Sequence, residues 1–116
     1  MEITRLERQG VRLLGLVGRL TLGGGAKALY TAVREEFDSG HPWVLLDLQQ
    51  TTLVDSTGLG VLVSCLTSAK SHQGILKLLN PSPKAEDVLL ITQTDQLFEI
   101  FHDEDQALES FQKSDQ

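Results

Sequence analysis

Apolar residues form two patterns along this chain, short continuous runs and longer stretches that repeat every three to four residues. Residues 11–17 are rich in valine and leucine, and together with the segment before Gly10 they predict a β-hairpin. Residues 43–48 and Ile75–Leu79 are almost entirely apolar, which is typical of strands covered on both faces. Residues 97–101 predict a last strand at the edge of the sheet.

The first two of the longer stretches predict helices that flank the strand at 43–48. The first follows the glycines at 23–25, and its apolar face would consist of Leu22, Ala26, Leu29, Val33 and Phe37. Ser39-Gly40 and the following Pro42 predict the end of that helix. The second helix is predicted to begin near Ser56-Thr57, with an inward stripe of Leu59, Leu62, Val63, Leu66 and Ala69.

Two shorter helices are predicted in the last third of the chain. Pro81 and Pro83 precede the first of them, whose apolar residues are Ala85, Val88, Leu89 and Ile91. Residues 103–111 predict a terminal helix with acidic residues in its first turn, where the helix dipole favours them. Because strands alternate with helices, we expect an α/β sandwich with a mixed, mostly parallel sheet of four to five strands and about four helices packed on it.

Length, charge and cysteine content indicate the number of domains, the kinds of partner and the location to be expected. At 116 residues without repeats or linker-like tracts, the chain is expected to be one domain over residues 1–116. Its formal net charge of -6 counts against nucleic acid and anionic membrane surfaces as partners. The single cysteine, Cys65, points to a reducing compartment, and we interpret it as a partly buried, inert thiol. With no signal-like or membrane-spanning run, the cytoplasm is the expected location.

Residues 54–62 are the most informative segment, because they lead from a predicted loop into a helix. Asp55 and Ser56 are both suitable N-cap residues, since their oxygens can accept hydrogen bonds from first-turn amides. Gly58 and Gly60 each cost up to about 1 kcal/mol relative to alanine in a helix, which favours a site where something approaches the backbone closely. From local chemistry alone, an ordinary cap and turn is the alternative interpretation.

Other motifs in the chain fail the tests for catalytic, nucleotide or metal sites. The glycines at 23–25 and Lys27 lack the spacing of a phosphate-binding loop. Ser56 lacks the Gly-x-Ser-x-Gly context of a hydrolase nucleophile, so we expect it to be a substrate of catalysis rather than its agent. The three histidines are dispersed, without metal-ligand spacing, and are interpreted as solvated surface residues: His41, His72 and His102. We therefore expect no enzymatic activity, no cofactor and no metal.

The segment Asp55-Ser56-Thr57-Gly58-Leu59-Gly60 resembles the signature of the STAS domain, a family named for sulphate transporters and anti-sigma factor antagonists. The resemblance continues through nearly the whole chain, in order, at residues 18–21, 44–48, 76–80, 92–101 and 107–108. Thr21 departs from the pattern, since many members carry an acid there, and this leaves the identity of the partner open.

The resemblance implies a bacterial partner switch that regulates transcription. The unmodified protein would bind an anti-sigma factor, a serine kinase with a GHKL-type ATP-binding fold, and so free the sigma factor. The kinase would phosphorylate Ser56, with Thr57 as the fallback acceptor, and a PP2C-type phosphatase would reverse the modification. The expected partner surface comprises Thr21, Leu22, Gly23, Gly24, Asp55, Ser56, Thr57, Gly58, Leu59, Gly60 and Val61. The protein itself is expected to be a monomer or a weak dimer.

Two other hypotheses remain open at this point. The chain could be an accessory STAS subunit of a stressosome or of a lipid-transport complex, with Ser56 serving only as a helix cap. A small-molecule-binding role would rest on analogy of fold alone.

Overall fold

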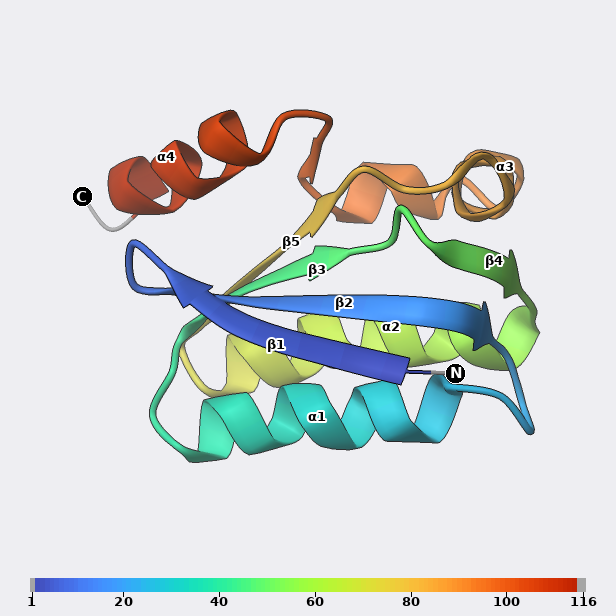
Figure 1. The fold of residues 1–116 in the computed structure, drawn as a ribbon, viewed down its shortest axis with the longest axis horizontal. Helices are drawn as coiled ribbons and strands as arrows, with labels where there is room; N and C mark the ends of the chain where they lie inside the picture. Colours follow the sequence, from blue (N-terminus) through green and yellow to red (C-terminus); the bar gives the residue numbers. More distant parts are fainter. Residues whose placement is uncertain (1, 115–116) are drawn as a thin grey trace.

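The computed structural model describes residues 2–114, which form a sheet with helices on both faces (Figure 1). The strands are β1 (Glu2–Arg8), β2 (Val11–Leu20), β3 (Trp43–Asp47), β4 (Thr51–Val54), β5 (Ile75–Leu79) and β6 (Ile100–Phe101). The helices are α1 (Ala26–Asp38), α2 (Ser56–Ser71), α3 (Pro83–Ile91) and α4 (Glu104–Ser114), with a 3₁₀ turn at Thr94–Leu97. The α/β sandwich is confirmed.

The sheet is mixed and mostly parallel, as expected. Its strands lie in the order β1-β2-β3-β5-β6, and only the β1–β2 hairpin is antiparallel. The ten-residue β2 serves two neighbours, because its first half pairs with β3 and Gly18–Leu20 pairs with β4 across a register shift. β4 is a sixth strand that the sequence did not predict, and it carries the chain directly to the start of α2.

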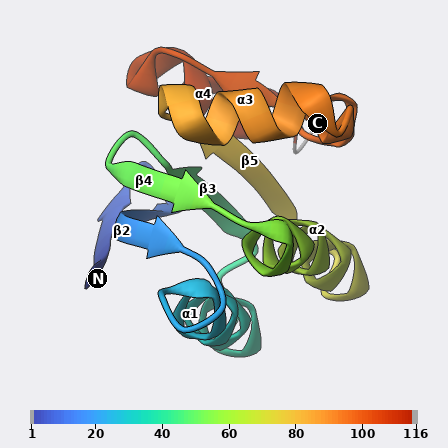
Figure 2. The same ribbon diagram turned by 90° about the vertical axis from the view of Figure 1, so that its right-hand side faces the viewer.

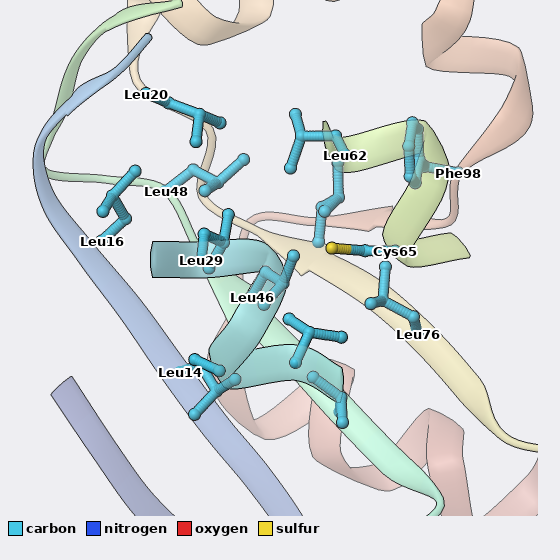
Figure 3. Close-up of a cluster of buried hydrophobic side chains, with 14 of the residues drawn as sticks. Leu14, Leu16, Leu20, Leu29, Leu46, Leu48, Leu62, Cys65, Leu76 and Phe98 are labelled. Atoms are coloured by element: carbon cyan, nitrogen blue, oxygen red, sulfur yellow. The ribbon is translucent and has the colours of Figure 1, made fainter. Parts of the chain in front are cut away.

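Side chains alternate between the two faces of the sheet and so form two apolar clusters. Leu14 and Leu46 face the α1–α2 pair, and Figure 3 shows them with Leu62 and Cys65 of α2 in one cluster. Leu13 and Leu45, one position earlier in each strand, pack under α4 with Phe111 and other residues of the second cluster. The helices α1 and α2 lie side by side on one face of the sheet, and α3 and α4 lie on the other (Figures 1 and 2). Ala85 and Leu89 of α3 nevertheless belong to the first cluster, and α4 packs on the second.

Two details of the predicted elements were wrong. Leu22 is 77% exposed, because α1 begins only at Ala26 and Leu22 lies in the turn before it. The expected strand at 97–101 is reduced to Ile100–Phe101, because the preceding 3₁₀ turn occupies Thr94–Leu97.

The inward face of α2 also differs from the predicted stripe. Leu62 and Ala69 are buried, whereas Leu59, Val63 and Leu66 are only partly buried against the core. Cys65 is fully buried rather than partly buried, and this burial raises the pKa of its thiol to about 12. At that pKa the thiol stays protonated and unreactive at neutral pH, so the interpretation of an inert cysteine agrees with its burial.

Candidate functional site

The predicted site lies at the carboxyl-terminal ends of β2 and β4, where α1 and α2 begin. Figure 2 looks onto these strand ends and shows the first turns of both helices facing the same side. Asp55 is the one residue between β4 and α2, while residues 21–25 form the turn between β2 and α1. Because β2 and β4 are parallel, their carboxyl ends bring these two connections together, which is where α/β sheets commonly place their sites.

Asp55 joins the two connections through its carboxylate. It is the N-cap of α2, and its Oδ1 accepts a hydrogen bond from the Gly58 amide at 2.8 Å. Its Oδ2 accepts a second bond, at 3.0 Å, from the amide of Leu22 in the β2–α1 turn. The pKa of Asp55 is lowered, chiefly by the Gly58 bond and further by the Leu22 bond, because amide donors stabilise the charged carboxylate.

Ser56 is the first residue of α2 and is exposed to solvent. Among residues 2–114 its hydroxyl makes no hydrogen bond, because the capping role belongs to Asp55. The interpretation of Ser56 as a helix cap is therefore wrong. The backbone decides this, since Asp55 has the extended φ and ψ of an N-cap residue, -100° and -175°, whereas Ser56 is already helical.

The two glycines of the signature have different surroundings. A Cβ at Gly58 would lie 1.9 Å from the carbonyl oxygen of Leu20, so α2 can approach the end of β2 only with glycine at this position. The close approach expected at Gly58 is thus to the chain's own strand. A Cβ at Gly60 would meet no atom within 4 Å, because Gly60 lies on the exposed side of the helix.

The β2–α1 turn has a defined shape despite its three glycines. Gly23 has a φ of +82°, which suits glycine. A Cβ at Gly24 would lie 2.7 Å from the carbonyl oxygen of Arg19. The amide of Gly24 donates to the carbonyl oxygen of Thr21 at 2.9 Å, and the amide of Gly25 donates to the carbonyl oxygen of Arg19 at 2.7 Å. These bonds leave the Leu22 side chain projecting from the turn.

A groove of about 500 Å³ runs between this turn and the first turns of the two helices. Its lining residues are Thr21, Leu22, Gly23, Gly24, Ala26, Lys27, Tyr30, Thr57 and Val61. Six of these belong to the predicted partner surface. The sequence reasoning missed Ala26, Lys27 and Tyr30, although Lys27 and Tyr30 lie three residues apart and so share one face of α1.

A family model described as the STAS domain matches residues 2–107. The chain belongs to the STAS domain family. A relative from Thermotoga neapolitana, named as a candidate anti-sigma factor antagonist, is 37% identical over 81 residues, or 69% of this chain and 72% of the relative. A Thermotoga maritima relative with the same kind of name is 33% identical over 82 residues, or 70% and 73% of the two chains.

Solved structures share this STAS fold. The crystal structure of a candidate anti-sigma factor antagonist from Thermotoga maritima superimposes with a TM-score of 0.84 at 28% identity, covering 93% of this chain and 92% of the other. The anti-sigma factor antagonist SpoIIAA in its unphosphorylated form gives a TM-score of 0.80 at 16% identity, covering 97% of each chain. The phosphorylated form of the Bacillus SpoIIAA gives 0.72 over 95% and 99% of the chains.

The predicted partner residues of this STAS domain fall into three groups around the groove. Thr21, Leu22, Gly23, Gly24, Thr57 and Val61 line it. Asp55 and Ser56 lie beside it at the start of α2. Gly58 is buried beneath the surface, Leu59 is partly buried against the core, and Gly60 is exposed on α2 outside the groove. The structure thus brings most of the predicted surface together while removing Gly58 and Leu59 from direct access.

Other chemistry has little support within residues 2–114. This part of the chain contains no cluster of three or more histidine, cysteine, aspartate or glutamate side chains that could hold a metal ion. His72 is not simply solvated, since its Nε2 lies 3.0 Å from Asp38 and its ring stacks on Phe37 at 5.6 Å. None of the helices in these residues combines the length and the apolar character needed to cross a membrane.

Proposed function

We propose that this chain is an anti-sigma factor antagonist that is controlled by phosphorylation of Ser56. Unmodified, it binds an anti-sigma factor of the GHKL serine kinase type and thereby frees the sigma factor. The kinase phosphorylates Ser56 and ends the interaction, and a PP2C-type phosphatase restores the binding form. The protein acts by binding rather than by catalysis, in the cytoplasm where sigma factors work.

The observation that carries this proposal is the exposed, uncommitted hydroxyl of Ser56. Asp55 supplies the N-cap of α2 and holds the β2–α1 turn, so neither task depends on the Ser56 side chain. A kinase can therefore modify Ser56 without removing a hydrogen bond that the fold uses. Helix N-termini also tolerate phosphate groups, because their first amides and the helix dipole favour negative charge.

A phosphate at Ser56 would change the surface far more than the fold. It adds a charge of about -1.5 to -2 and three acceptor oxygens directly beside the Asp55 carboxylate. A partner seated on the groove and on the start of α2 would face this new charge and would bind less tightly. The names of the Thermotoga relatives support the antagonist role, and the two forms of SpoIIAA show that a protein of this fold exists in both states.

A pull-down from host lysate with ATP and magnesium tests the proposal. The wild-type protein, Ser56→Ala and Ser56→Asp serve as baits, with Thr57→Val as the matched control at the next residue. Intact mass and peptide mapping of the recovered wild-type bait locate the phosphate. We expect modification of wild type and of Thr57→Val, and no modification of Ser56→Ala.

The retained proteins provide the second readout. We expect a GHKL-type kinase to remain on Ser56→Ala and to be lost from Ser56→Asp, with affinity reduced at least tenfold when the purified kinase is titrated. A Ser56→Asp protein that binds this kinase as tightly as wild type contradicts the proposal. Recovery of transport-complex subunits on an unmodified bait indicates the accessory-subunit role instead.

A further inference from the structure

Lys27 lies at the side of the groove, and no described residue pairs with its positive charge. It is the second residue of α1, it is exposed, and within residues 2–114 it takes part in no ion pair or hydrogen bond. Five other basic residues, Arg5, Arg8, Arg12, Lys77 and Lys113, each lie within salt-bridge distance of a glutamate. Within residues 2–114, Arg19, Lys70 and Lys84 also form no ion pair, but they do not line the groove. In a chain with a net charge of -6, an unpaired lysine beside the groove is an attractive position for a carboxylate from outside.

Several residues that line the same groove are apolar. Leu22 projects from the β2–α1 turn and is 77% exposed, while Val61 and Tyr30 line the groove from α2 and α1. An exposed leucine beside an open groove leaves apolar surface that burial in a partner would stabilise. Among the described residues, the lining of the groove therefore combines apolar side chains with the positive charge of Lys27.

We infer that the partner inserts an apolar side chain between Leu22 and Val61 and places a carboxylate beside Lys27. The occupant is an acidic-apolar segment of the anti-sigma factor, so the inference rests on the proposed function and specifies the chemistry of its interface. A free small anion would leave the apolar side chains of the groove uncovered. A second copy of this chain would bring two net charges of -6 together, which disfavours self-association at this surface.

The test measures the affinity of the purified kinase that the unmodified protein retains. Lys27→Met keeps the alkyl stem and removes the charge, and we expect it to weaken binding about three- to fivefold. Lys27→Glu reverses the charge, and we expect a loss of more than tenfold with a slower association rate. Leu22→Ala, at a residue already exposed, is expected to weaken binding about tenfold without destabilising the fold.

Lys84→Glu is the matched control for charge reversal. Lys84 is exposed on α3, on the face of the sheet opposite α1 and α2, so its reversal changes the net charge equally but not the groove (Figure 1). We expect this control to change affinity less than twofold. Raising the salt concentration from 50 to 500 mM is expected to reduce the difference between wild type and Lys27→Met, because the contact is electrostatic and partly exposed.

The outcomes separate this inference from the proposed function. If the kinase responds to Ser56→Asp but binds both Lys27 variants and Leu22→Ala like wild type, the proposed function stands and the groove inference is overturned. If no kinase binds the unmodified protein, both fail together. If sedimentation shows a dimer at 100 µM protein that Lys27→Glu dissociates, the occupant is a second copy and the inference is again overturned.

Discussion

Two carboxylates lie near the two ends of α1 and are held in opposite ways. Near the start of the helix, Asp55 accepts hydrogen bonds from two backbone amides, those of Gly58 and Leu22. Near its end, the almost fully buried Glu36 accepts from the guanidinium groups of Arg5 at 3.1 Å and Arg12 at 2.9 Å. Along α1, which has 13 residues, Glu36 lies ten residues after Ala26, or about 15 Å along the helix axis at 1.5 Å per residue.

The difference shows which end is available for a partner. Because Asp55 is satisfied by backbone amides, the side chains beside it keep their polar groups free, including the hydroxyl of Ser56 and the ammonium of Lys27. The Glu36 carboxylate instead forms ion pairs with Arg5 of β1 and Arg12 of β2, so these two cations are already paired. The same ion pairs connect the β1–β2 hairpin to α1. Exposed polar groups therefore lie near the start of α1, whereas the ion pairs near its end connect the helix to the β1–β2 hairpin.

The largest expected effect comes from Gly58→Ala. The new Cβ would lie 1.9 Å from the Leu20 carbonyl oxygen, so α2 must move away from β2 and loosen the Asp55 cap. We expect a loss of about 3 kcal/mol in the free energy of unfolding, measured in urea, together with loss of kinase binding.

Gly60→Ala is the matched control in the same helix. No atom lies within 4 Å of its added Cβ, and alanine favours the helix, so we expect a gain of up to about 1 kcal/mol. Equal effects of the two substitutions would show that helix propensity, rather than contact with Leu20, determines the role of Gly58.

Glu36→Ala should have the next largest effect and should act on stability alone. It leaves Arg5 and Arg12 without their shared partner, and we expect a loss of about 2 kcal/mol, moderated by the exposure of the two arginines. Urea unfolding measures the loss, and kinase affinity is expected to change less than twofold. Reduced kinase affinity in a folded Glu36→Ala protein would contradict the division between the two ends of α1.

Glu35→Ala is the control for this second substitution. The Glu35 side chain is 58% exposed, against 4% for Glu36, and within residues 2–114 its one ion pair is with Arg5. Exposed ion pairs contribute little, so we expect a change within about 0.5 kcal/mol. A larger loss would indicate that the exposed pair, rather than the buried carboxylate, ties the hairpin to α1.

Asp55→Asn should have a smaller effect than Glu36→Ala at neutral pH, because asparagine is also a good N-cap although its amide nitrogen cannot accept the bond that the Leu22 amide donates to Oδ2. The stabilities of wild type and Asp55→Asn are expected to differ more at acidic pH. The pKa of Asp55 is lowered by folding, so its charged form stabilises the protein at pH values above its ordinary value of 3.8. That stabilisation is lost as the pH falls below 3.8 through the lowered pKa of the folded state.

Urea unfolding from pH 6 to pH 2 is the measurement. Wild type is expected to lose stability more steeply than Asp55→Asn below pH 4, because only the wild-type cap becomes protonated there. Parallel curves for the two proteins would show that the bonds from Gly58 and Leu22 do not favour the charged carboxylate.

Much of the fold could be predicted because its signals are local. The apolar runs at β3 and β5 and the repeats in α1 and α2 reflect burial on a face set by strand or helix geometry. β4 was not predicted, because four residues with an exposed middle pair, Thr52 and Leu53, carry no clear pattern. The burial of Lys77 within the apolar run of β5 depends on residues distant in sequence. Lys77 packs against Phe111 of α4 and donates a hydrogen bond to Ser110 at 2.9 Å.

The candidate site was predicted from its signature, but the roles of its residues were only partly predicted. Asp55 and Ser56 are both chemically able to cap α2, so the sequence could not choose between them. Leu22 fitted the helical repeat of α1, yet the helix starts four residues later and leaves this side chain exposed. Lys27 and Tyr30 were missed because their importance depends on a groove that two distant segments form.

The sequence by itself determined the family, the order of the elements and the position of the signature at the start of α2. Tertiary structure alone decided which polar groups near the signature form hydrogen bonds within the fold and which remain exposed for a partner. The physical reason is that capping and hydrogen bonding depend on the amides that folding brings within reach. The Leu22 amide lies 33 residues from Asp55 in sequence, and its bond to that carboxylate exists only because β2 and β4 end side by side.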